Sequence, residues 1–76
     1  MSYNPRSAVV PEMNVYTYYL DNGIRMVKFG TGDCIDIARQ HRIPGDTIQG
    51  CRPGDDHSRR WDPEARRWEY MYLEFA

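Results

Sequence analysis

Four residues of the types that bind transition metals lie in the middle of the chain: Cys34, His41, Cys51 and His57. Cysteine and histidine are the usual zinc ligands, and zinc motifs place pairs of them only a few residues apart. This chain has no Cys-x-x-Cys, and His41 lies seven positions after Cys34. We therefore expect no metal and no other cofactor.

Cys34 is also the best-placed nucleophile, because it opens a predicted helix whose dipole favours a thiolate. Asp33 and Asp36 oppose that effect, and His41 is two helical turns away, too far to take the thiol proton directly. A chain of 76 residues also leaves little room for an enclosed substrate pocket. The sequence therefore predicts a protein that is not an enzyme, with no catalytic residues.

The overall composition of the chain restricts which classes of binding partner are expected. The net charge is −1, whereas a dedicated nucleic-acid binder is usually clearly basic. No apolar run approaches the roughly 20 residues of a membrane span. Two cysteines without a recognisable signal peptide favour free thiols. We expect a cytoplasmic protein with no membrane partner, for which nucleic acid is possible but not the favoured partner.

The segment 15–29, VYTYYLDNGIRMVKF, predicts a β-hairpin. Asn22-Gly23 is the dipeptide most suited to a two-residue type I′ turn. That turn pairs Tyr18 with Val27 and Tyr16 with Phe29. The predicted core face is Tyr16, Tyr18, Leu20, Val27 and Phe29, and Tyr19 and Met26 lie on the other face.

A short amphipathic helix is predicted over residues 34–42. Ile37 and Ala38 occupy its apolar face, and Asp33 or Thr31 can cap its first turn. Pro44-Gly45 ends it. A second short helical turn is predicted over 46–49, followed by a polar loop.

A second hairpin is predicted around Asp62-Pro63-Glu64-Ala65, a type I turn signal. Its strands are a short one over 58–61 and a long, central one over 66–75. The predicted fold is α+β: an arm (1–12), then one domain (13–76) in which two hairpins form a four-stranded antiparallel sheet with one helix on one face (ββαββ).

Large rings outnumber what one face of such a sheet can bury, so some must remain exposed. Tyr, Trp and Arg dominate the energetics of protein interfaces. The predicted binding set is Tyr19, Met26, Arg59, Arg60, Trp61, Arg66, Arg67, Trp68 and Tyr70. We expect an inhibitor or adaptor that binds a larger protein or nucleoprotein complex, or that pairs with itself as a homodimer. By analogy of small size and lack of motifs, such chains occur among phage- or mobile-element-type anti-defence inhibitors.

An alternative interpretation uses residues 34–52, CIDIARQHRIPGDTIQGCR. The spacing of its apolar residues resembles that of helix-turn-helix DNA-binding proteins. The resemblance implies a small DNA-binding regulator with Thr47 and Gln49 reading bases and Arg42 and Arg52 contacting phosphates.

Overall fold

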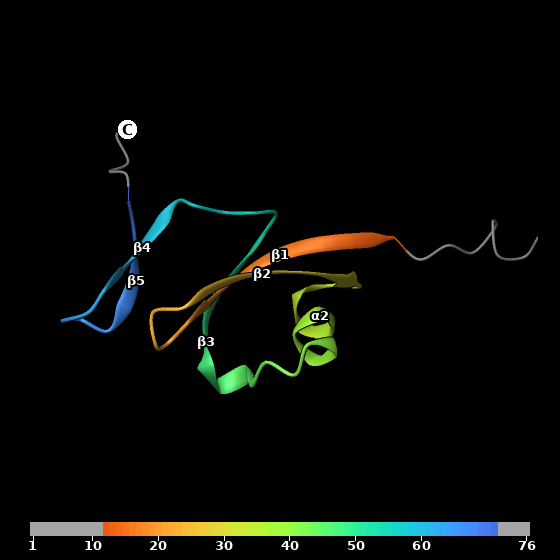
Figure 1. Ribbon diagram of the computed structural model, residues 1–76, viewed down its shortest axis with the longest axis horizontal. Helices are drawn as coiled ribbons and strands as arrows, with labels where there is room; N and C mark the ends of the chain where they lie inside the picture. The colour runs from red at the N-terminus through yellow and green to blue at the C-terminus, as the bar shows by residue number, and fades with distance from the viewer. Residues whose placement is uncertain (1–11, 72–76) are drawn as a thin grey trace, which may run out of the picture.

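A computed structural model of the chain describes residues 12–71. It contains two antiparallel sheets and one α-helix, which confirms the predicted α+β class. The elements are β1 (Met13–Leu20), β2 (Arg25–Thr31), α2 (Cys34–Gln40), the 3-10 turn η1 (Gly45–Thr47), β3 (Ile48–Pro53), β4 (Arg59–Asp62) and β5 (Arg67–Tyr70) (Figure 1). The sheets have strand orders β2-β1-β3 and β4-β5, so the prediction of a single four-stranded sheet is wrong. The predicted arm, apart from Glu12, and the end of the predicted long strand lie outside the described residues.

The first hairpin forms where predicted, but its loop is one residue longer. Leu20 accepts a hydrogen bond from the Gly23 N–H at 3.1 Å and donates its own N–H to Ile24 at 2.9 Å. The loop is therefore Asp21-Asn22-Gly23, with Gly23 at a φ of 86°. A three-residue loop with glycine in the left-handed conformation is a common alternative to the type I′ turn, and Asn-Gly is compatible with both.

This longer loop moves the register of β2 by one residue, which exchanges the two faces of that strand. Tyr18 pairs with Met26 and Tyr16 with Lys28. Met26 therefore packs against the core beneath the helix. Val27 and Phe29, predicted in that core, lie on the opposite face, and Phe29 is 62% exposed.

Helix α2 packs on the sheet face that carries Tyr18. Asp33 caps it, accepting hydrogen bonds from the N–H groups of Ile35 and Asp36 at 3.0 Å each. Ile37 and Ala38 are buried against Tyr18 and Leu20, which confirms the predicted apolar face. The helix ends at Gln40, two residues before its predicted end.

Strand β3 was not predicted. Residues 46–49, expected as a helical turn, instead span the end of η1 and the start of a strand that pairs with the free side of β1. In this ladder Tyr18 faces Cys51 and Tyr19 faces Gly50. Pairing with a strand about thirty positions earlier in the chain overrides the local turn signals.

The β4–β5 hairpin does not extend the first sheet. It lies toward the turn end of the first hairpin, on the face opposite α2 (Figure 1). The Trp68 indole N–H donates to the Leu20 carbonyl at 2.7 Å, and Trp61 packs against Gly23. The first sheet is thus covered on both faces, and the adjacent residues Tyr18 and Tyr19 are both buried.

Candidate functional site

Most of the predicted aromatic binding residues lie together, but they pack against one another between the first sheet and the β4–β5 hairpin. The Trp68 ring contacts Tyr19 edge-on with ring centres 4.7 Å apart, and Trp61 lies 5.7 Å from Trp68. The Arg59 guanidinium stacks between Tyr19 and Tyr70, at 5.1 and 4.9 Å from their ring centres. Tyr19 is fully buried, so the prediction that it lies on an open surface is wrong.

The other predicted binding residues separate. Met26 lies on the helix face of the first sheet, away from the β4–β5 hairpin. Arg60, Arg66 and Arg67 are exposed on the outer side of the hairpin. Arg67 contacts Glu69 at 4.0 Å, a distance at which an exposed ion pair contributes little. Of the predicted set, these three arginines and Tyr70 remain accessible to a partner.

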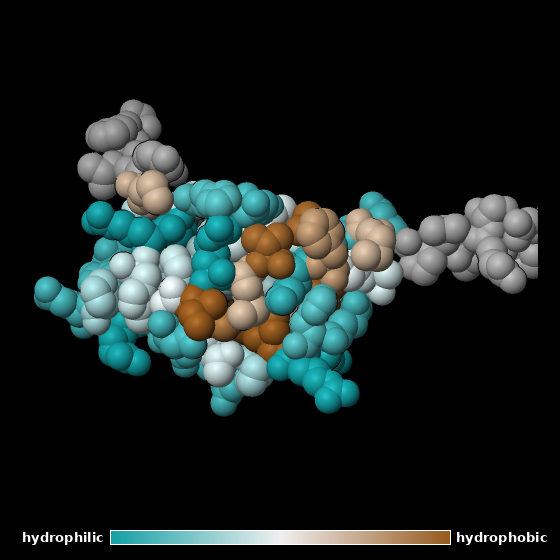
Figure 2. Space-filling view, viewed as in Figure 1, coloured by the Kyte–Doolittle hydropathy of each residue, from teal (hydrophilic) through white to brown (hydrophobic). Residues whose placement is uncertain are grey.

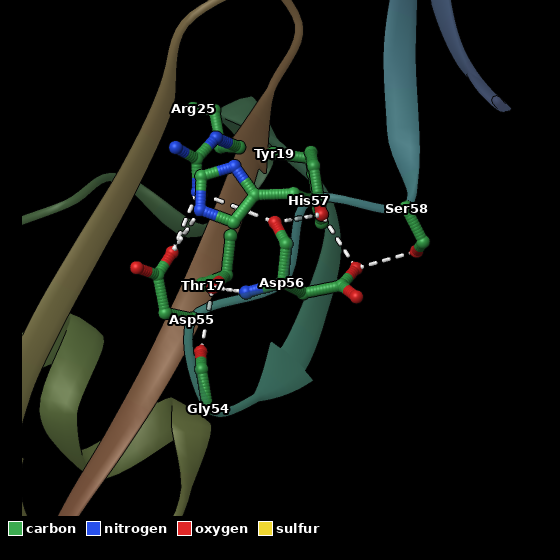
Figure 3. A network of polar contacts seen from close by, with 8 residues as sticks. All are labelled: Thr17, Tyr19, Arg25, Gly54, Asp55, Asp56, His57 and Ser58. Atoms are coloured by element: carbon green, nitrogen blue, oxygen red, sulfur yellow. Dashed lines mark hydrogen bonds and ion pairs between the residues drawn. The ribbon is translucent and has the colours of Figure 1, made fainter.

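A polar network fixes the loop 54–58 onto β1 (Figure 3). The Thr17 hydroxyl, buried in the sheet, donates to Gly54 at 2.6 Å and accepts from the Asp56 N–H at 2.8 Å. The Tyr19 hydroxyl donates to the Asp56 carboxylate, and this hydrogen bond is the main cause that lowers the pKa of Asp56 below its ordinary value. The loop is therefore part of the cover over this face.

The same loop holds a histidine and a serine, but they do not form a nucleophile–base pair. Ser58 donates to Asp56 at 2.8 Å, whereas His57 contacts Asp55 at 3.0 Å. Asp55 also pairs with Arg25 at 2.9 Å, which is the leading cause of the lowered pKa of Asp55. These contacts orient the loop, and they do not place His57 to receive a proton from Ser58.

Of the four potential metal ligands, Cys34 and Cys51 line one groove, but the two histidines lie apart from each other. The His41 ring contacts the Phe29 carbonyl at 2.8 Å, and His57 belongs to the loop on the opposite face. Within residues 12–71, no three His, Cys, Asp or Glu side chains are grouped to hold a metal ion. In the same range no helix has the length and apolarity to cross a membrane.

Residues 34–52 do not adopt a helix-turn-helix geometry. The stretch holds one α-helix, a 3-10 turn and the greater part of strand β3. Thr47 bonds its hydroxyl to Pro44 at 2.6 Å, and Gln49 donates to the Arg66 carbonyl at 3.1 Å. Arg42 and Arg52 are exposed, but no recognition helix presents these four residues to a DNA groove.

An apolar groove of about 440 Å³ runs between α2 and β3 on the helix face of the first sheet. This volume is within the range of small-molecule and side-chain pockets. In Figure 2, apolar residues gather over the middle of the first sheet and beside the helix, surrounded by hydrophilic ones. The groove is lined by Tyr18, Cys34, Ile35, Ala38, Arg39, Ile43, Gly45, Ile48 and Cys51.

The outer edge of β3 borders this groove. The Gly54 N–H donates to the Val15 carbonyl, so these two residues form a hydrogen-bonded pair of the β1–β3 ladder. Because hydrogen-bonded pairs alternate along an antiparallel ladder, the N–H and C=O groups of Gly50 and Arg52 also point toward β1. Those of Cys51 point away from β1. Pro53 also occupies an outward position, where its missing N–H costs no ladder bond. The Cys51 N–H and C=O therefore face the outer edge of the sheet.

The opposite edge of the sheet is partly blocked. Gln40 donates to the Thr31 carbonyl at 2.7 Å and accepts from its N–H at 3.4 Å, and His41 contacts the Phe29 carbonyl. Side chains at the C-terminal end of α2 therefore occupy outward backbone groups of β2, as in sheets whose edges are protected from pairing. The edge of β3, rather than that of β2, is the one that adjoins an apolar groove.

The buried Tyr18 hydroxyl and the half-buried Cys51 thiol both form part of the groove. The Tyr18 hydroxyl donates to the Cys34 carbonyl at 2.5 Å, and burial raises the pKa of Tyr18 above its ordinary value. Burial is also the main cause that raises the pKa of Cys51 to about 12.

The groove was not predicted from the sequence because one of its walls is β3, a strand that the local signals did not indicate. The available signal in the sequence was Ile35, an apolar residue beside the apolar face of the predicted helix, and in the structure this side chain is 58% exposed.

No protein-family model, curated protein or solved structure matches the chain.

Proposed function

We propose that this chain is a small non-enzymatic protein-interaction module, an inhibitor or adaptor that binds an extended apolar segment of a larger protein. The observation that carries the proposal is the position of the groove between α2 and β3, directly beside the outward-facing edge of β3. Domains that bind peptides by strand addition combine these two features: main-chain hydrogen bonds give affinity, and a pocket for alternate side chains gives specificity.

The partner's chemistry follows from the groove. A strand added to β3 pairs with the Cys51 N–H and C=O and directs every second side chain toward the groove. The walls supplied by Ile35, Ile43 and Ile48 suit aliphatic or aromatic side chains. The exposed Arg39 on the same wall favours an acidic residue in the partner segment.

The proposal is tested by selecting random peptides displayed on phage against the immobilised protein and measuring the enriched peptide by calorimetry. We expect apolar residues at alternate positions and a shift of the Cys51 amide resonance on binding. Ile35→Glu, which places a charge on the groove wall, should weaken binding by about tenfold or more.

Ile24→Glu is the matched control, because Ile24 is also an exposed isoleucine, at 48% against 58% for Ile35, but lies outside the groove. It should leave the affinity within about twofold of the unmodified protein. Thermal unfolding of both variants checks that neither loses its fold. Equal effects of the two variants, or a Cys51 amide that does not respond, would refute binding at this groove.

A further inference from the structure

The chain's two cysteines, seventeen positions apart, both line the groove. Cys34 is the first residue of α2, and Cys51 lies in β3. Both are half-buried and pack against the same apolar cluster. Tyr18 connects them: it faces Cys51 across the β1–β3 ladder, and its hydroxyl donates to the Cys34 carbonyl.

The surroundings of the Cys51 thiol favour its uncharged form. A side-chain interaction with Cys34 is the second cause, after burial, of the raised pKa of Cys51, so the uncharged thiol of Cys51 is favoured beside Cys34. A disulfide carries no charge, so the apolar groove does not oppose it as it opposes a thiolate. Both cysteines keep some exposure, which gives a small reagent access.

We propose that Cys34 and Cys51 form a redox-active pair that closes to an intramolecular disulfide by exchange with a low-molecular-weight disulfide such as oxidised glutathione. The Cys34 thiolate attacks one sulfur of the reagent, which forms a mixed disulfide and releases one thiolate. Cys51 then loses its proton to solvent and its sulfur attacks that of Cys34, which releases the second thiolate. The protein loses two electrons and two protons, and one oxidised glutathione becomes two reduced ones.

Closing the bond links the first residue of α2 to β3. A cross-link between residues this far apart restricts the unfolded chain and so raises the melting temperature relative to the reduced protein. This inference concerns the thiols themselves and does not depend on what the groove binds.

The test uses the full-length reduced protein in a series of oxidised-to-reduced glutathione ratios, quenched with acid, alkylated and weighed by intact mass spectrometry. Because the chain has two cysteines, three products are distinguishable: the mass lower by two hydrogen atoms, glutathione adducts, and dimers. We expect the first product, with both free thiols lost together and both restored by dithiothreitol.

The denatured protein is the reference for proximity. At one glutathione ratio, the yield of intramolecular disulfide relative to glutathione adduct should be at least about tenfold higher in buffer than in denaturant. Cys34→Ser and Cys51→Ser should each stop at a single glutathione adduct. Persistent adducts or dimers of the native wild-type protein, without the intramolecular product, would overturn the proposal whatever the variants do.

Discussion

The two faces of the sheet β2-β1-β3 are buried by different means. On one face, α2 covers Tyr18 and Leu20 with the apolar side chains of Ile37 and Ala38. On the other, the loop 54–58 and the β4–β5 hairpin cover Thr17 and Tyr19 with hydrogen bonds and aromatic contacts.

This difference shows how the consecutive residues Tyr18 and Tyr19 of β1 can both be buried although their side chains lie on opposite faces of the sheet. Burial of the helix face is stabilised by the removal of apolar area from water, which is a non-directional effect. The helix can therefore cover this face incompletely, and a groove remains beside β3. The opposite face depends on directional bonds that require specific partners, such as Trp68 to Leu20. The apolar face is therefore the one with space for a ligand, and the polar face is the one that fixes the position of the hairpin.

The largest effect should come from the helix face. Ile37→Ala removes a fully buried side chain from the centre of the core and should lower the free energy of unfolding by about 2–5 kcal/mol. Chemical denaturation measures this loss. Ile35→Ala on the same helix, at an exposed position, should cost less than about 1 kcal/mol. Equal losses would mean that α2 does not pack through Ile37.

An intermediate effect is expected where the hairpin joins the other face. Trp68→Phe keeps an aromatic ring but removes the N–H that donates to the Leu20 carbonyl, which then keeps only the Gly23 N–H as a donor, so we expect a loss of about 0.5–1.5 kcal/mol. Hydrogen exchange should show faster opening of β4 and β5 than of β1. Tyr70→Phe, on the same hairpin but 55% exposed, is the control and should change stability little. Unchanged exchange in Trp68→Phe would show that this bond does not hold the hairpin.

The smallest effect should be a pH dependence of the unfolding free energy that arises from the loop 54–58, on the face opposite α2. The Tyr19 hydroxyl bond lowers the pKa of Asp56 in the folded protein relative to about 3.9 in the unfolded chain. Its stabilisation is present above the unfolded value and is lost as pH falls through the folded value. Asp56→Asn should therefore destabilise the protein near neutral pH and flatten the decline of the unfolding free energy below about pH 4.

Asp55→Asn provides the comparison for this titration. Asp55 also has a lowered pKa, chiefly through Arg25, but its side chain is 59% exposed and solvent screens the ion pair. We expect a smaller change than for Asp56→Asn in denaturation curves measured at neutral and acidic pH. The reverse order would show that the ion pair, rather than the Tyr19 bond, holds the loop.

Several local elements could be predicted because their signals lie within a few residues. Asp33 and the pair Ile37-Ala38 define the start and the buried face of α2. Asp62 organises the second turn, accepting the N–H groups of Glu64 and Ala65, and both hairpins form.

The predictions failed where a local signal was compatible with two structures. Asn22-Gly23 suits both a two-residue and a three-residue loop, and the choice between them decided whether Met26 or Val27 faced the core. Residues 48–53 were predicted as the end of a helical turn followed by a loop, because the partner that makes them a strand is the distant β1. The groove and most of the candidate site depend on that pairing.

The sequence by itself determined much of the short-range structure of this protein: the cap of α2, the positions of the two hairpins and, over residues 12–71, the mixture of strands with one helix. These features follow from hydrogen bonds and backbone preferences that span only a few residues. Only the tertiary structure decided that β3 joins β1, that the second hairpin packs on a face instead of an edge, and that Tyr19 is buried while Phe29 is exposed. A strand rich in apolar residues on both faces does not specify which neighbours will cover each face, because apolar burial is non-directional and several arrangements satisfy it.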